Sequence, residues 1–179
     1  MMLRRAGSVV VALATLVGVV LVAAPASAAP QACGINWGSG VKSGPSVMGG
    51  NLVGLRAGRQ ECYDRLVFDV RGAVGGYWVS YVDEVTEDPT GNPVPLRGGA
   101  KLQVTVYSSA YDMETGTPTY VYANRAELVD VTGFQTFRQV AWAGSFEGTT
   151  SVGLGVRARL PFRVFTLADR VVVDVAHVW

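Results

Sequence analysis

The chain has 179 residues, and its 15 basic side chains nearly balance its 14 acidic ones. A polypeptide this close to neutral has no general electrostatic attraction for nucleic acid or anionic lipid, so we expect neither as a partner. One histidine and two cysteines are also too few for the usual ligand set of a catalytic zinc ion. We expect no metal and no cofactor.

Residues 1–28 predict a secretory signal peptide. The chain starts with Arg4 and Arg5, continues as an apolar run from Val9 to Ala24 and closes on small residues at Ala28. The apolar run is shorter than the roughly 20 residues of a membrane span, so we expect no span once the signal peptide is removed. The remaining chain of about 150 residues suits one domain, secreted to the cell envelope.

The two cysteines, Cys33 and Cys62, both lie after the predicted cleavage site, in the mature chain. An isolated pair in an oxidising compartment predicts a disulfide bond. The bond is expected to tie down an N-terminal arm over residues 29–61, which is too rich in glycine and serine to hold itself by burial. The folded domain is then expected over residues 62–179.

Alternation with a period of two predicts strands along residues 62–179. The clearest runs are RLVFDV (65–70), GYWVSYV (76–82) and KLQVTV (101–106); shorter ones are 128–131, 134–141, 151–156, 162–167 and the closing RVVVDVAHVW. Glycine and proline clusters separate them, and no sustained helical stripe occurs. Seven or eight short strands predict an all-β protein, an antiparallel β-sandwich, with Phe68 and Trp78 in its core.

Two loops stand out between these strands. The acidic run DEVTEDPTGNP (83–93) lacks the Asp-x-Asp-x-Asp-Gly spacing of a calcium loop, and its turn-forming residues favour a solvated turn. The segment DMETGTPTYVYA (112–123) predicts a long exposed hairpin or loop, with Tyr120 and Tyr122 on one side if it is extended.

Gly153 and Gly155 in SVGLGVRARLPFRVF raise the question of a phosphate-binding loop. Such a loop needs a following helix, whereas Leu160-Pro161 and another strand follow here. We therefore interpret the two glycines as a bulge or a close backbone approach. Val152, Leu154 and Val156 are expected to face the core.

No catalytic constellation is recognisable. The only histidine, His177, has neither a nucleophile elbow nor a reactive cysteine to serve, and we expect it to be partly packed or solvated at a strand end. Five carboxylates along the chain are candidates for glycoside hydrolysis, but their spacing selects no pair: Asp69, Asp83, Glu127, Glu147 and Asp174. We expect no catalytic residues.

Aromatic and arginine side chains are better candidates for binding. Aromatic faces beside guanidinium groups can hold sugar rings and carboxylates. The residues that we select as a ligand-binding set are Arg138, Trp142, Arg157 and Arg159.

The mature chain resembles the AMIN-like domain proteins of high-GC Gram-positive bacteria. The resemblance rests on ACGINWGS, LRAGRQECYDRLVFDV, GYWVSYV, VPLRGGAKLQVTV, RVVVDVAHVW and, most specifically, TFRQVAWAGSFEGTTSVGLGVRARLPFRVF (136–165). It implies kinship with the AMIN domain, a small β-sandwich that targets cell-wall amidases to the division site and also occurs in pilus secretins. We expect no amidase catalytic domain in these 179 residues, and the family brings no site residues to transfer.

Three functions follow as hypotheses. The first is a non-catalytic cell-envelope module that contacts peptidoglycan, so that its partner is a cell-wall glycan. The second is a module that binds an envelope protein through an open sheet edge or through residues 112–123. The third is an extracellular hydrolase, which would require two carboxylates facing one cleft.

Overall fold

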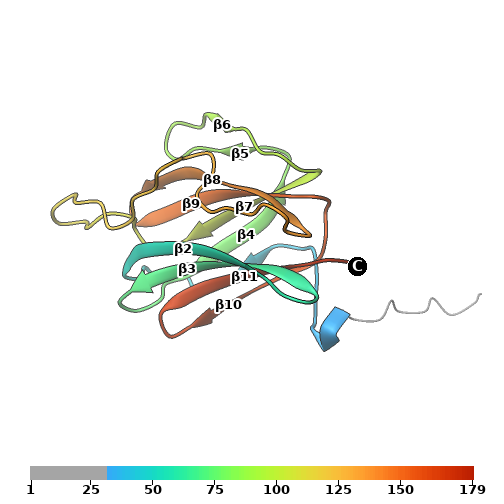
Figure 1. Cartoon of the computed structure of the whole chain (residues 1–179). Helices are drawn as coiled ribbons and strands as arrows, with labels where there is room; N and C mark the ends of the chain where they lie inside the picture. The colour runs from blue at the N-terminus through green and yellow to red at the C-terminus, as the bar shows by residue number, and fades with distance from the viewer. Residues whose placement is uncertain (1–31) are drawn as a thin grey trace, which may run out of the picture.

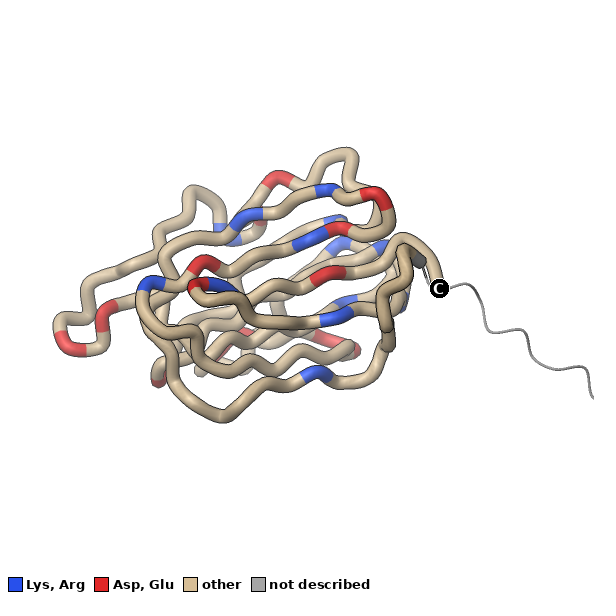
Figure 2. The backbone as a smooth tube through the Cα atoms, turned by 90° about the horizontal axis from the view of Figure 1, so that it is seen from below, with Lys and Arg blue, Asp and Glu red and all other residues tan. Residues whose placement is uncertain are grey.

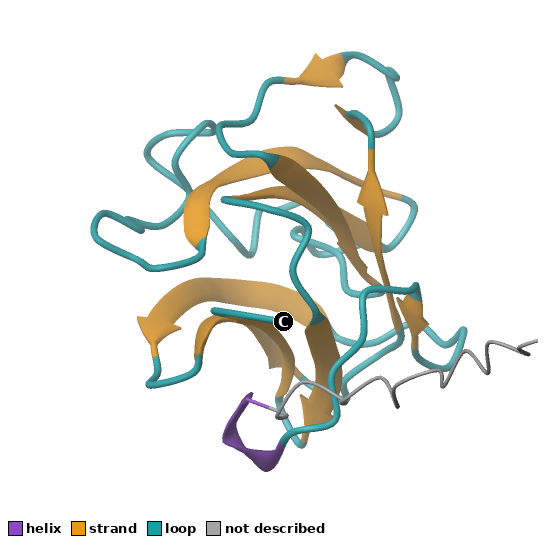
Figure 3. Ribbon diagram, turned by 90° about the vertical axis from the view of Figure 1, so that its right-hand side faces the viewer, coloured by secondary structure: helices purple, strands orange, loops and turns teal. Residues whose placement is uncertain are grey.

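A computed structural model describes residues 32–179 as two antiparallel sheets packed face to face (Figures 1 and 3). The predicted signal peptide lies outside the described residues. The five-stranded sheet has the order β1 (Lys42–Ser43), β4 (Tyr77–Val82), β7 (Ala100–Val106), β9 (Thr149–Val156) and β8 (Phe137–Phe146). The four-stranded sheet has the order β10 (Phe162–Leu167), β11 (Arg170–Ala176), β3 (Tyr63–Arg71) and β2 (Asn51–Arg59).

Two small elements complete the described chain. A short ribbon of β5 (Val85–Thr86) and β6 (Pro93–Val94) lies beside the five-stranded sheet, and a 3-10 turn, η1 (Ala32–Gly34), lies beside the other one (Figure 3). Eight strands of the described residues have six or more residues. The all-β, antiparallel sandwich predicted from the alternating pattern is thus confirmed.

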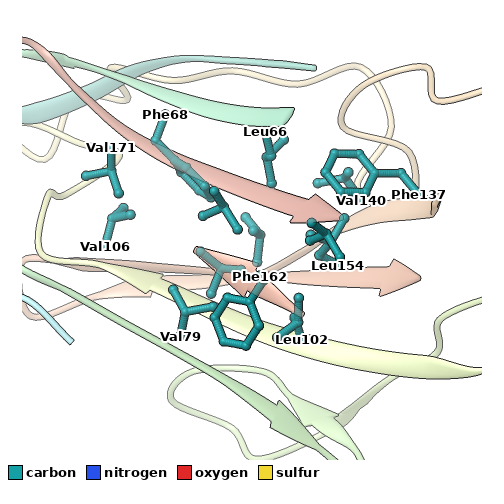
Figure 4. Packing of buried hydrophobic residues seen from close by; sticks show 14 of the residues in the cluster. Leu66, Phe68, Val79, Leu102, Val106, Phe137, Val140, Leu154, Phe162 and Val171 are labelled. Carbon is teal, nitrogen blue, oxygen red and sulfur yellow. The ribbon is translucent and has the colours of Figure 1, made fainter. Parts of the chain in front are cut away.

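The core lies between the two sheets and is apolar. In β3, Leu66 and Phe68 face inward beside Val173 and Val171 of β11, because residues directly opposite in an antiparallel pair share a face. Leu154 of β9 lies on the inner face of the other sheet, and all five side chains are at most 1% exposed (Figure 4). Burial of this apolar surface is the main stabilising contribution to the fold.

Most predicted strands are confirmed, but one is wrong and one is shifted. Residues 128–131 form a loop instead of a strand, in which Leu128 donates its amide to Val140 and Asp130 holds a turn by accepting the amide of Thr132 at 2.8 Å. The apolar side chains of this loop still pack on the core, which explains the strand-like pattern. The strand expected at 134–141 begins at Phe137 and continues to Phe146.

The prediction for Trp78 is wrong, whereas that for Phe68 is confirmed. Trp78 lies opposite Thr105 of β7, one position away from the buried Val79–Val104 pair, and therefore belongs to the outer face of its sheet. It is half-buried there. The alternating pattern of GYWVSYV cannot show which of its two apolar faces is the inner one.

The expected boundary between the arm and the domain also needs correction. Residues 51–59, assigned to the arm, form β2 and pair with β3 along its whole length. Leu52 of β2 is fully buried, so this part of the arm does contribute to the core. The disulfide bond between Cys33 and Cys62 is confirmed, and it joins the start of the described chain to the β2–β3 connection.

Gly153 and Gly155 allow close packing on the outer face of β9, as expected. A Cβ atom at residue 153 would lie 2.7 Å from the Cδ1 atom of Leu96, and one at residue 155 would overlap the carbonyl oxygen of Arg97. Val152, Leu154 and Val156 face the core, and β10 follows β9 without an intervening helix.

Candidate ligand-binding site

The four residues selected from the sequence lie in different surroundings. Arg138 lines a pocket beside Phe134 and bonds its carbonyl, and Trp142 lies at a separate pocket on β8. Arg157 donates to the carbonyl oxygen of His177, whereas the Arg159 guanidinium lies over the ring of Tyr81, 4.8 Å from its centroid. The four therefore do not converge on one site, and the pocket at Trp142 provides the best candidate among the described residues.

We call this hollow the aromatic pocket. It has a volume of about 520 Å³, and four of its lining residues are aromatic: Tyr111, Tyr120, Tyr122 and Trp142. The indole of Trp142 lies 5.0 Å from the ring of Tyr122 and 6.1 Å from that of Tyr120, measured between centroids. Tyr120 and Tyr122 thus lie on one side of their loop, as predicted.

The edge strand β8 and two loops build the aromatic pocket. The amide of Trp142 donates to the carbonyl of Arg125 at 2.7 Å, which fixes the loop after Tyr122 along the edge. On the same strand, the amide of Asp88 donates to Ala143 at 2.7 Å. Gly144, with φ at +117°, makes this second approach possible, because a Cβ atom there would overlap the Asp88 carbonyl.

Two acidic residues, Glu87 and Asp88, border the aromatic rings. The hydrogen bond from Arg125, with a second one from Thr90, holds the pKa of Glu87 below its usual value. Burial, with the neighbouring Tyr122, raises the pKa of Tyr120. At neutral pH the Glu87 carboxylate is therefore ionised and the Tyr120 phenol is neutral.

A smaller hollow of about 310 Å³ lies on the other side of Trp142. Pro93, Pro95 and Ala126 contribute an apolar lining, and the hollow shares Glu87 and Trp142 with the aromatic pocket. The two hollows therefore adjoin each other at the β8 edge.

In a comparison with protein families, residues 50–177 match the model of the AMIN-like domain. This chain belongs to the AMIN-like family. Searches among curated proteins and solved structures gave no match. Membership indicates a cell-envelope-associated binding module, and the match begins next to β2, so it includes the strand that the sequence pattern placed in the arm.

The AMIN-like domain carries a second cluster, on the outer face of the four-stranded sheet, that the sequence analysis missed. Asp174 is fully buried and accepts hydrogen bonds from Arg65 at 2.7 and 2.9 Å and from Arg163 at 2.9 Å. The bond to Asp174 raises the pKa of Arg65 above its usual value. Both guanidinium groups also lie 5.1–5.5 Å from the ring centroid of Phe165.

This second cluster is mainly structural. The Asp174 carboxylate on β11 forms ion pairs with Arg163 of β10 and Arg65 of β3. These ion pairs link the three neighbouring strands. The register that creates it pairs residues more than 100 positions apart, as with Arg65 and Asp174, and no local sequence signal could reveal it. Basic and acidic residues of the AMIN-like domain are in fact interspersed along the whole backbone (Figure 2).

His177 was expected to be partly packed or solvated at a strand end, and it is packed and buried, at 5% exposed. Its Nδ1 atom lies 3.1 Å from the carbonyl oxygen of Glu61, and its Nε2 atom lies 3.2 Å from Oδ1 of Asp64. The other oxygen of Asp64 accepts the backbone amides of Thr136 and Phe137 at 2.5 and 3.0 Å. The pair thus joins the end of β11 to the starts of β3 and β8.

Three of the five dispersed carboxylates are in ion pairs: Asp69 with Arg56, Glu127 with Arg97, and Asp174 with its two arginines. Across residues 32–179 the structure holds no group of three or more His, Cys, Asp or Glu side chains suited to a metal ion. Over the same residues, no helix is long and apolar enough to cross a membrane.

Proposed function

We propose that this AMIN-like domain is a non-catalytic binding module that holds a ring of the cell-wall glycan in the aromatic pocket. The observation that carries the proposal is the convergence of Trp142, Tyr120 and Tyr122 on one open hollow at the β8 edge. Aromatic rings offer apolar faces that can stack on a sugar ring while their polar edges bond its hydroxyls.

The polar edges of this pocket are available for a ligand. Among the described residues, the indole N–H of Trp142 and the hydroxyls of Tyr111, Tyr120 and Tyr122 make no hydrogen bonds with other protein groups. A buried sugar ring needs donors and acceptors of this kind, since unpaired hydroxyls are costly. The arrangement supports recognition of a ring with hydroxyls on its rim.

The absence of catalysis is part of the same proposal. His177, the one histidine of the chain, lies with Asp64 beneath the starts of β3 and β8 and not among the residues that line the aromatic pocket. Glu87 is held in an ion pair with Arg125. These contacts support a role in holding a ligand without a nucleophile and base acting on it.

Retention on purified peptidoglycan tests the proposal. We expect the wild-type protein to be retained and Trp142→Ala to lose at least about ten-fold in affinity, the scale of one lost aromatic contact of 1.4 kcal/mol. Trp179→Ala is the matched control, because Trp179 is 63% exposed, its indole donates to the carbonyl of Arg159, and neither residue lines the pocket. Tyr122→Ala provides a second, less disruptive variant.

Thermal unfolding of each variant separates loss of binding from loss of fold. The proposal fails if the wild type is not retained. It also fails if Trp142→Ala and Tyr122→Ala, both folded, are retained as well as Trp179→Ala.

A second candidate function is recognition of an envelope protein by the protruding loop at residues 112–123 (Figure 1). Val121 is 80% and Met113 63% exposed on this loop. Asp112 pre-organises it by accepting the amides of Glu114 and Thr115 at 3.0 and 2.8 Å. Such exposed apolar side chains on a fixed loop suit a protein partner.

Recognition of an envelope protein through an open sheet edge receives less support at β8. The edge of this strand is already occupied where Trp142 bonds Arg125 and Leu128 bonds Val140. Crosslinking in the envelope fraction tests the loop version: Met113→Ser, at a residue outside the lining of the aromatic pocket, should strongly reduce crosslinks to a protein and leave retention on peptidoglycan unchanged. Crosslinks that survive this substitution undiminished contradict it.

A further inference from the structure

We propose that the aromatic pocket recognises a positively charged amine, with Asp88 as its counter-charge. This inference rests on the proposed function and narrows the chemistry of the ligand. The charged residues that line the aromatic pocket are both acidic, Glu87 and Asp88, and its remaining lining residues are uncharged.

The two carboxylates differ in what satisfies them. Glu87 is paired with Arg125 and accepts the Thr90 hydroxyl at 3.1 Å. Asp88 accepts only the hydroxyl of Ser151, at 2.9 Å, and no lysine, arginine or histidine of residues 32–179 lies within salt-bridge distance of it. A half-buried carboxylate with one neutral donor retains unused acceptor capacity, which an ammonium group would fill.

Asp88 is also fixed in place before any ligand arrives. Its backbone amide bonds Ala143 of β8, its side chain bonds Ser151 of β9, and the positive φ of Gly144 permits the close contact. A charge that is already positioned costs little additional ordering on binding.

The aromatic rings add a second attraction for a cation. Trp142, Tyr120 and Tyr122 line the hollow that Asp88 borders, and the faces of aromatic rings attract ammonium groups by about 0.5–2 kcal/mol. An acetylated amine offers neither the charge nor the three donors of an ammonium group. The pocket should therefore prefer the free amine over its acetylated form.

Two components of a cell wall can carry this group: an amino sugar without its acetyl group, and the side chain of a diamino acid in a peptide. The recognised chemistry is the same in both, a primary ammonium on a short carbon skeleton. Matched pairs of probes, differing only in acetylation, distinguish the two sources.

The experiment measures the affinity of the wild-type protein for four probes by calorimetry, at a pH where the amines are charged. The probes are tetramers of glucosamine and of N-acetylglucosamine, and a tripeptide with a free or an acetylated lysine side chain. We expect at least one free-amine probe to bind about ten-fold more tightly than its acetylated counterpart.

Asp88→Asn should reduce that preference to less than about two-fold, because the amide keeps the Ser151 contact and removes the charge. Glu84→Gln is the matched control, since Glu84 is an exposed acidic residue outside the pocket. It should leave the preference unchanged.

The outcomes separate the two proposals. Equal binding of both tetramers and both peptides, or a preference that Asp88→Asn does not change, overturns the amine inference while glycan binding stands if the tetramers bind. An Asp88-dependent preference for the free-lysine peptide, without binding of either tetramer, supports the amine inference. It overturns the proposal that the aromatic pocket holds a ring of the cell-wall glycan. Absence of binding to all four probes overturns both.

Discussion

Replacement of Gly155 by alanine tests how the outer face of β9 is packed. A Cβ atom at this position would lie well under 3.0 Å from the carbonyl oxygen of Arg97, a separation that real Cβ atoms essentially never show. The Arg97 backbone cannot move freely, because its amide donates to Oε1 of Gln139 at 2.8 Å. Gln139 is 5% exposed, so displacement of Arg97 leaves a buried acceptor without its partner.

The expected loss in the free energy of unfolding can be worked out from these contacts. Loss of the hydrogen bond to a buried acceptor costs about 1–3 kcal/mol, and the overpacking adds about 1–3 kcal/mol. Replacing a glycine inside a strand returns about 0.5–1 kcal/mol. The net destabilisation is about 3 kcal/mol, which corresponds to a decrease in Tm of roughly 6–12 °C for a domain of this size.

Chemical and thermal unfolding, followed by tryptophan fluorescence with the disulfide intact, measures this loss. Gly58→Ala in β2 is the control, because a Cβ atom there would meet only Nε2 of Gln60, at 3.7 Å. It should leave stability within about 1 kcal/mol of the wild type. A Gly155→Ala protein as stable as the wild type, or a Gly58→Ala protein equally destabilised, refutes the packing argument.

Three further predictions concern buried polar groups and the disulfide. Asp64→Ala should lower the free energy of unfolding by about 3–5 kcal/mol because two buried amides lose their acceptor and the buried imidazole of His177 loses its partner, and an unchanged urea midpoint would contradict this. Replacing Cys33 and Cys62 by serine should cost about 3–4 kcal/mol, again read from the urea midpoint; no loss would show that the bond does not restrict the unfolded chain. Burial raises the pKa of Tyr81 to about 12, so the free energy of unfolding should fall as the pH rises from about 10 to 12. Ultraviolet titration should show a tyrosine ionising near pH 12; this step should disappear in Tyr81→Phe, and its persistence would assign it to another tyrosine.

The sequence pattern predicted much of the sandwich but not all of its strands. The runs at 65–70, 76–82 and 101–106 alternate cleanly and are strands, since a pleated strand exposes successive side chains to opposite faces. β2 was missed because Gly54 and Gly58 interrupt its pattern and a register shift lies between Leu52 and Gly54. A strand was wrongly predicted at residues 128–131, because loop side chains that pack on the core are apolar as well.

The candidate site could be predicted only in part. Trp142 was selected from its residue type, and the shared side of Tyr120 and Tyr122 was expected from their spacing of two. The sequence did not indicate that these rings meet Trp142, nor that Asp88 arrives beside them. Those contacts depend on hydrogen bonds from two separate loops to the edge of β8.

The sequence by itself determined the fold class, the disulfide pair and the absence of a phosphate loop at residues 153–155. Each of these follows from local chemistry: side-chain period, a single cysteine pair, and Pro161 at a position where a helix after Gly155 would have to continue. Tertiary structure alone decided which aromatic rings converge, which face of β4 is buried and which carboxylate lacks a cation. These depend on strand order and register, which bring residues distant in the chain into contact and leave no trace in any short stretch of it.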